Sequence, residues 1–96
     1  MSAKIPTLRQ DIIATAARSL HKQGQMTCCP TALDEWLEYS RAAHSVARCR
    51  GMSVAAMRAD VDAMSWPRLV NAVDRQVARL WKQSQWMDAM SVERTS

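Results

Sequence analysis

The chain has 96 residues and a formal net charge of +4, and 48% of its residues are hydrophobic. This length suits a single domain spanning residues 1–96, because domains below about 50 residues rarely bury enough surface to be stable alone. Two glycines, no phenylalanine and abundant Ala, Leu and Met favour packed helices over a sheet. No apolar run reaches the roughly 20 residues of a membrane span, so we expect no membrane partner.

The cysteines are Cys28, Cys29 and Cys49. An odd number of cysteines fits a reducing compartment and predicts free thiols. Adjacent cysteines also differ from the Cys-x-x-Cys spacing that brings two thiolates to one zinc ion, so no metal or other cofactor is expected. The segment from Met1 to Thr7 lacks the charged-then-apolar layout of a secretory signal, and we therefore expect a cytoplasmic protein.

Charge is unevenly distributed along the chain, with acidic residues in the middle and basic residues toward both ends. The first segment of the chain and the last predicted helix each hold four cations against one carboxylate; these are Lys4, Arg9, Arg18 and Lys22 against Asp11, and Arg68, Arg75, Arg79 and Lys82 against Asp74. A polyanion such as DNA, or an acidic protein surface, is a partner that this distribution would attract.

The first half of the chain predicts two helices. Thr7 and Gln10 have the spacing of a capping box, and apolar residues follow at helical intervals, which predicts a helix over 7–22 that Gly24 ends. Pro30 suits a first helical turn, and an amphipathic pattern then continues to about Gly51, which predicts one second helix.

The second half predicts two more helices. Ser53 is a good N-cap for a short helix in which Val54, Met57, Val61 and Met64 share one face. Ser65 can cap a long fourth helix, whose seam is formed by Val70, Val73, Val77, Leu80, Ser84 and Met87. Residues 1–6 and 91–96 lack apolar periodicity and are expected to be frayed. The predicted fold is an all-α compact bundle of about four helices, which can contain a helix-turn-helix.

The connection before the third predicted helix has the pattern of a helix-turn-helix. Ala47 is small enough to let two helices approach closely, and Gly51, four residues later, suits the backbone of a tight turn. Ser53 then caps the second helix of the pair, which Met57 and Val61 would anchor. An ordinary helical hairpin with a glycine stop and a serine cap is the simpler interpretation of the same residues.

The residue sequence of this segment resembles the recognition helix of DeoR-type bacterial repressors. Gly51-Met52-Ser53 followed by Met57-Arg58-Ala59-Asp60-Val61 is similar to Gly-Val-Ser followed by Ile-Arg-Arg-Asp-Leu in that family. The similarity is a short motif that covers about twenty residues of the chain. One departure is Arg50, which stands where such motifs usually bury an apolar residue.

The resemblance implies a small DNA-binding transcriptional regulator in which the helix from Ser53 to Met64 enters a major groove. Arg58 would then contact a base edge, and Ser53 at the start of this helix would also contact the DNA. Arg48 and Arg50 would contact phosphates beside the turn. Arg75, Arg79 and Lys82, on the last helix beside its apolar seam, would hold the DNA backbone. The simpler interpretation of that stripe is a solvated helix face.

A competing hypothesis is a small helical protein that binds another protein, as an inhibitor or adaptor. Trp81, Trp86 and Met87 cluster near the end of the last helix, and Trp, Met and Arg are enriched at protein interfaces. The same seam could pair two copies of the chain, so a homodimer is a further hypothesis. An enzyme is not expected, because neither His21 nor His44 stands near a nucleophile at a suggestive spacing.

Overall fold

The computed structural model describes the backbone of residues 5–95 and the side chains of residues 5–85. Within those limits the chain is all-helical, as predicted, and contains no strand. The helices are α1 (Leu8–Lys22), α2 (Pro30–Tyr39), α3 (Arg41–Cys49), α4 (Val54–Asp62) and α5 (Trp66–Thr95). The expected number of about four helices was therefore low by one, because the second predicted helix divides in two.

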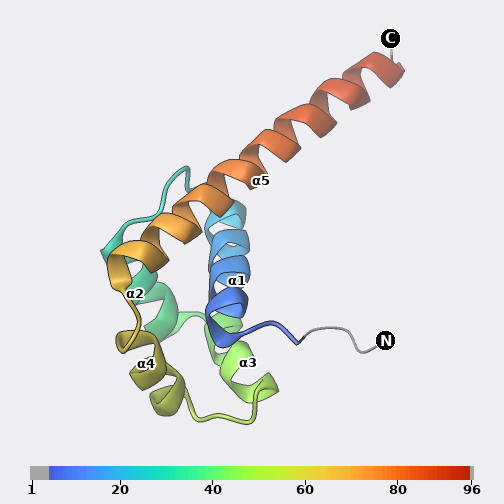
Figure 1. The fold of residues 1–96 in the computed structure, drawn as a ribbon. Coiled ribbons are helices and arrows are strands. Elements are labelled where there is room, and N and C mark those ends of the chain that lie inside the picture. Colours follow the sequence, from blue (N-terminus) through green and yellow to red (C-terminus); the bar gives the residue numbers. More distant parts are fainter. Residues whose placement is uncertain (1–4, 96) are drawn as a thin grey trace.

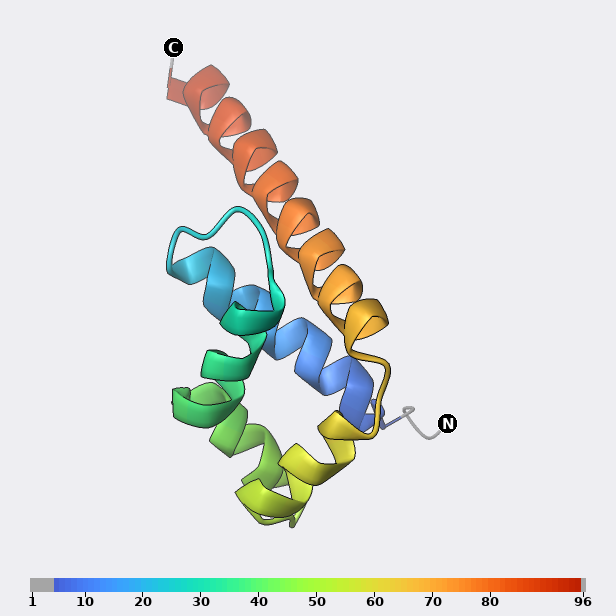
Figure 2. The same ribbon diagram turned by 90° about the vertical axis from the view of Figure 1, so that its left-hand side faces the viewer.

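Helices α1 and α5 form the main packing pair of the fold. They lie against each other, while α2, α3 and α4 complete the body (Figures 1 and 2). Helix α5 then continues past the end of α1 as a projecting arm (Figure 1). No Gly or Pro follows Pro67 in the sequence, so no residue stops the helix. It runs to Thr95, through most of the segment that was expected to be frayed.

Both ends of α1 are closed by bonds that the sequence predicts. The Thr7 hydroxyl accepts from the Gln10 backbone N–H at 3.2 Å, and the Gln10 side chain accepts from the Thr7 N–H at 2.9 Å. At the other end Gly24 has φ +79°, and the Gln25 N–H donates to the Leu20 carbonyl at 2.9 Å. This left-handed glycine ends the helix as a Schellman motif does.

Ser40 separates α2 from α3, where the sequence pattern predicted one continuous helix. Its backbone is extended, with ψ 130°, and its hydroxyl accepts from the Ala42 N–H at 3.2 Å. A serine side chain that bonds the backbone in this way competes with helical hydrogen bonding and favours a new N-cap. The chain therefore turns at Ser40, and α3 takes a direction of its own.

One hydrophobic core joins all five helices. Its largest fully buried side chains are Ile12, Leu33, Leu37, Met57, Val61, Leu69, Val73 and Val77. Alanines fill the closest approaches, since Ala16, Ala17, Ala43 and Ala47 are all fully buried. Val54 shares a sequence face with Met57 and Val61, but it lies at the first turn of α4 and is 40% exposed.

The long connection between α1 and α2 is fixed to α5 by two hydrogen bonds. The Cys28 N–H donates to Asp74 Oδ1 at 2.9 Å, and the Trp81 indole N–H donates to the Gln25 carbonyl at 2.8 Å. Trp81 also packs edge-on against His21, with ring centroids 4.6 Å apart. These contacts position the start of α2 on the core.

Replacing Asp74 tests this attachment. In D74A the partly buried Cys28 N–H loses its acceptor, and leaving such a donor unpaired costs about 1–3 kcal/mol. We expect a melting temperature lower by several degrees, measured by circular dichroism. N71A, at an exposed position on the same helix, is the control. Equal melting temperatures for the two variants would contradict the proposed role of the bond.

The cysteines should differ in reactivity. Burial, together with the neighbouring Cys29 and Asp74, raises the pKa of the Cys28 thiol to about 11, whereas Cys29 and Cys49 are exposed. Because the thiolate is the reactive form, iodoacetamide at pH 8 should modify Cys29 and Cys49 first, and Cys28 only after denaturation. Peptide mass spectrometry distinguishes the sites. Labelling of Cys28 as rapid as that of the other two cysteines would contradict the burial of its side chain.

The same shift has a consequence for stability. In the folded state the Cys28 thiol stays protonated at pH values above 9.0, which is the pKa of an unperturbed thiol. The free energy of unfolding should therefore fall as the pH rises from about 9 toward about 11, because the unfolded chain ionises first.

Candidate nucleic-acid interface

The turn between α3 and α4 has the backbone conformation that the sequence predicts. Ala47 is fully buried, and Gly51 has φ +68°, in the left-handed region that favours glycine. The Met52 N–H donates to the Ala47 carbonyl at 2.9 Å, and the Gly51 N–H donates to the Arg48 carbonyl at 3.0 Å. These two bonds are those of a Schellman motif, which ends α3 and redirects the chain.

Ser53 begins α4 as its predicted N-cap. Its hydroxyl accepts from the Ala56 N–H at 3.0 Å. Met57 and Val61, the predicted anchors of this helix, are fully buried. The hydroxyl of Ser53 is thus already engaged in capping, and the contact of Ser53 with DNA stays a prediction.

Arg50 fixes the turn to the start of α1. Its guanidinium donates to Asp11 Oδ2 at 2.7 Å and to the Pro6 carbonyl at 3.0 Å. The side chain is 26% exposed. This explains why a basic residue stands where an apolar one was expected, since an ion pair replaces the apolar contact. The predicted phosphate contact would have to compete with Asp11.

Arg58, the predicted base reader, lies within a network of internal contacts. It donates to Asp34 of α2 at 2.5 Å and to Asp62 of its own helix at 3.0 Å. The hydrogen bond that Arg58 donates to Asp34 is the largest cause that raises the pKa of Arg58 above its usual value. The guanidinium also lies over the Trp66 ring, 5.4 Å from its centroid. Contact with a base would require these interactions to break.

The outer surface of α4 consists of small apolar side chains and carboxylates. Its exposed residues are Val54, Ala55, Ala56, Ala59, Asp60 and Asp62. Arg58 is the basic residue of this helix, and two carboxylates already bind it. A duplex approaching α4 would therefore meet alanines and carboxylates.

The outward face of α5 is basic. Arg68, Arg75, Arg79 and Lys82 are all exposed, and none forms an ion pair with another described residue. Leu69, Val70, Val73 and Val77 occupy the buried face of the same helix. Helical geometry places the four cations, here called the α5 basic stripe, on the side away from the core rather than beside the seam.

A second basic face, on α3, was only partly predicted. Arg41, Ser45 and Arg48 are exposed at intervals of four and three residues, opposite the buried Ala43 and Ala47. Arg48 was a predicted phosphate contact, but Arg41 and Ser45 were not singled out. On one continuous helix, the pattern placed Arg41 and Arg48 on the same side as Asp34, Glu35 and Glu38. The missed signal was the N-cap quality of Ser40, followed by nine residues without a carboxylate.

Among the predicted protein-interface residues, the structure describes the side chain of Trp81. This residue is half-buried, and its indole N–H is bound to the Gln25 carbonyl. The side chains of Trp86 and Met87 lie outside the described residues. Trp81 thus contributes to the attachment of the α1–α2 connection.

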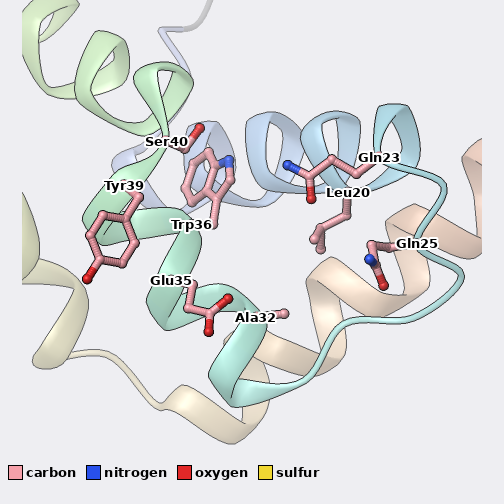
Figure 3. Close-up of a pocket in the computed structure, with 8 residues that line it drawn as sticks. All are labelled: Leu20, Gln23, Gln25, Ala32, Glu35, Trp36, Tyr39 and Ser40. Carbon is pink, nitrogen blue, oxygen red and sulfur yellow. The ribbon is translucent and has the colours of Figure 1, made fainter.

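A shallow pocket lies between the end of α1, the following connection and α2 (Figure 3). Gln23, Gln25, Glu35, Trp36 and Tyr39 are among its lining residues, and Tyr39 extends away from α1 (Figure 3). The Trp36 indole nitrogen is buried without a protein partner. The lining holds one carboxylate and no histidine or cysteine, so it offers no pair of groups for nucleophilic or acid–base chemistry.

The described residues contain no cluster of three or more His, Cys, Asp or Glu side chains arranged to hold a metal ion. None of the helices in this part of the chain combines the length and apolar character needed to cross a membrane.

Comparisons with protein-family models, with curated proteins and with solved structures gave no significant match. The partner of this chain is therefore inferred from its own geometry and charge.

The network around Arg58 should stabilise the fold. R58A removes two ion pairs and the cation–π contact with Trp66, and we expect the free energy of unfolding to fall by about 1–2 kcal/mol. R75A is the matched control, because it removes an exposed arginine that has no ion-pair partner among residues 5–85 and should stay within about 0.5 kcal/mol. Urea unfolding at low and high salt measures both. A loss no larger in R58A than in R75A would contradict a structural role.

Proposed function

We propose that this chain is a small DNA-binding protein that acts as a regulator by occupying a site on duplex DNA. The observation that supports the proposal is the separation of unpaired charge in the fold. In the described part of the chain, the exposed cations without an ion pair are Arg9, Arg18, Lys22, Arg41, Arg48, Arg68, Arg75, Arg79 and Lys82, on α1, α3 and α5. The exposed carboxylates without one are Glu35, Glu38 and Asp60, on α2 and α4.

Internal ion pairs strengthen this separation. Arg50 neutralises Asp11, which is a carboxylate of α1. Asp74, the carboxylate of the central part of α5, accepts from the Cys28 N–H and lies away from the α5 basic stripe. In the described part of the chain, the outward surfaces of α1, α3 and α5 are thus left with cations, and such a surface raises the local concentration of a polyanion.

The α5 basic stripe has dimensions that suit a phosphate backbone. Arg68 and Lys82 are fourteen residues apart in one helix, or about 21 Å along its axis. Duplex DNA carries one negative charge per about 1.7 Å of axis, so several phosphates fall within that length. Arg75, Arg79 and Lys82 would bind phosphates and orient the protein without selecting a sequence.

The helix-turn-helix interpretation supports the same function through its turn. The Ala47–Gly51 corner and the Ser53 cap provide a rigid pair of short helices at one end of the body (Figure 2). A regulator would present one of these helices to a groove. A homodimer formed through α5 would double the number of contacts with DNA. The projecting arm of α5 is the part of the helix that could pair with a second copy (Figure 1).

The proposal predicts salt-sensitive binding to a labelled random-sequence duplex, measured by fluorescence anisotropy between 50 and 200 mM salt. R75A/R79A/K82A removes three phosphate contacts and should reduce the slope of log K against log salt by about 2.7, with a loss of affinity of about tenfold or more at 200 mM. N71A/Q83A/Q85A changes three exposed uncharged residues of the same helix and should bind as the wild type does.

Two outcomes would contradict the proposal. The first is an absence of binding by the wild type at 50 mM salt, which would favour the competing hypothesis of a protein partner. The second is equal weakening by the charge variant and its control, which would indicate a change in the helix and no specific role for the cations.

A further inference from the structure

Two short helices, α3 and α4, are candidates for the contact with DNA, and their exposed surfaces differ. Both have nine residues, and both are capped by a serine. Helix α3 exposes Arg41, Ser45 and Arg48 and contains no carboxylate. Helix α4 exposes mostly alanines and the carboxylates Asp60 and Asp62. The resemblance in the sequence pointed to α4, whereas charge and exposure favour α3.

The exposed face of α3 is fixed rigidly by the packing behind it. Ala43 and Ala47 are fully buried on the opposite side, where their small side chains allow close approach of the neighbouring helices. His44 is held by a 3.0 Å hydrogen bond between Nε2 and the Glu38 carbonyl. Residues of a binding surface are presented most accurately by such a supported helix.

The chemistry of this face suits base edges. Arginine can donate two hydrogen bonds to guanine O6 and N7, and serine can bond to any base. Arg41 and Arg48 are seven residues apart, which is about 10 Å along the helix and comparable to three base-pair steps. Neither arginine has an ion-pair partner among the described residues, unlike Arg58.

Helix α1 adds a cation beside the same face. Arg18 and Thr15 of α1 line a shallow groove together with Ser45 and Cys49 of α3. Arg18 is exposed and without an ion pair in the described part of the chain. A helix inserted into a groove of DNA has phosphates along both sides, and a cation beside α3, as Arg18 is, suits a contact with one of them.

We propose that α3 is the helix that enters the major groove, with Arg41 and Arg48 bound to base edges and Arg18 bound to a flanking phosphate. This inference rests on the proposed DNA-binding function. In it, α4 and its Arg58 network support α3 from the side and do not contact bases. The partner is a duplex with guanines spaced about three base pairs apart.

The test begins with in vitro selection of duplexes from a random pool by the wild-type protein, followed by affinity measurements on the enriched sequence and on a random duplex. R41K/R48K keeps the charge but loses the bidentate geometry of arginine. It should lower affinity for the enriched sequence by about tenfold or more while affinity for random duplex changes by less than about twofold.

A second pair of variants compares the helices directly. S45Q and A59Q each add the same amide side chain to an exposed position of a nine-residue helix. We expect S45Q to weaken binding to the enriched sequence or change the selected sequence, and A59Q to leave both unchanged. Circular dichroism and the random-duplex affinity establish that each variant is folded.

The outcomes separate this inference from the proposed function. No binding to any duplex at low salt overturns both. Binding without an enriched sequence, or an enriched sequence that R41K/R48K and S45Q recognise as the wild type does, overturns the assignment to α3 and leaves DNA binding intact. If A59Q is the one variant that no longer binds the enriched sequence, the groove contact belongs to α4.

Discussion

The packing of α1 against α5 is the contact on which the other helices depend. The buried residues of α1 are Ile12, Ala16, Ala17 and Leu20, and those of α5 in the described part are Leu69, Val70, Val73 and Val77. All belong to one core with the buried residues of α2, α3 and α4. Burying side chains of the size of Leu or Val stabilises a fold by about 1.5–3 kcal/mol each before entropy is counted. Because α5 is fixed through one face, its opposite face is left to solvent, and that is where its cations lie.

Polar contacts then set the positions of the shorter helices. Arg50 links the α3–α4 turn to α1, and Arg58 links α4 to α2. Asp74 holds the connection before α2 on α5. Each of these contacts joins residues far apart in the sequence, and the two ion pairs also neutralise charges that stay partly exposed. The cations that remain unpaired are those outside this framework.

Local rules predicted much of the fold. The capping box at Thr7, the turn at Gly51 and the cap at Ser53 each depend on a few neighbouring residues, and the structure has all three. The seam of α5 is confirmed from Val70 to Leu80, while the side chain of Met87 lies outside the described residues. The break at Ser40 was missed because the apolar spacing continues across it, and spacing alone does not reveal a serine that bonds the backbone.

The candidate site was less predictable for a different reason. Arg58 and Arg41 are both arginines on short helices, and nothing local to either residue shows which one meets a carboxylate. Asp34 is brought to Arg58 by the folding of α2 against the core, at a separation of 24 residues. The sequence could therefore list the cations of the chain, but only the fold shows which of them are left unpaired.

The separation of charge also determines which side of the molecule can face a polyanion. At physiological salt, exposed charges interact over about 8 Å, so a duplex senses mainly the helices that it touches. Contact through α4 would bring Asp60 and Asp62 close to phosphates, while contact through α3 would bring Arg41, Arg48 and Arg18. The carboxylates on α2 and α4 would thus repel the duplex from one side of the body, and the cations of α1 and α3 would attract it to the other. Such a surface selects an orientation before any base is contacted, which is why charge favours α3 over the helix that the sequence resemblance singled out.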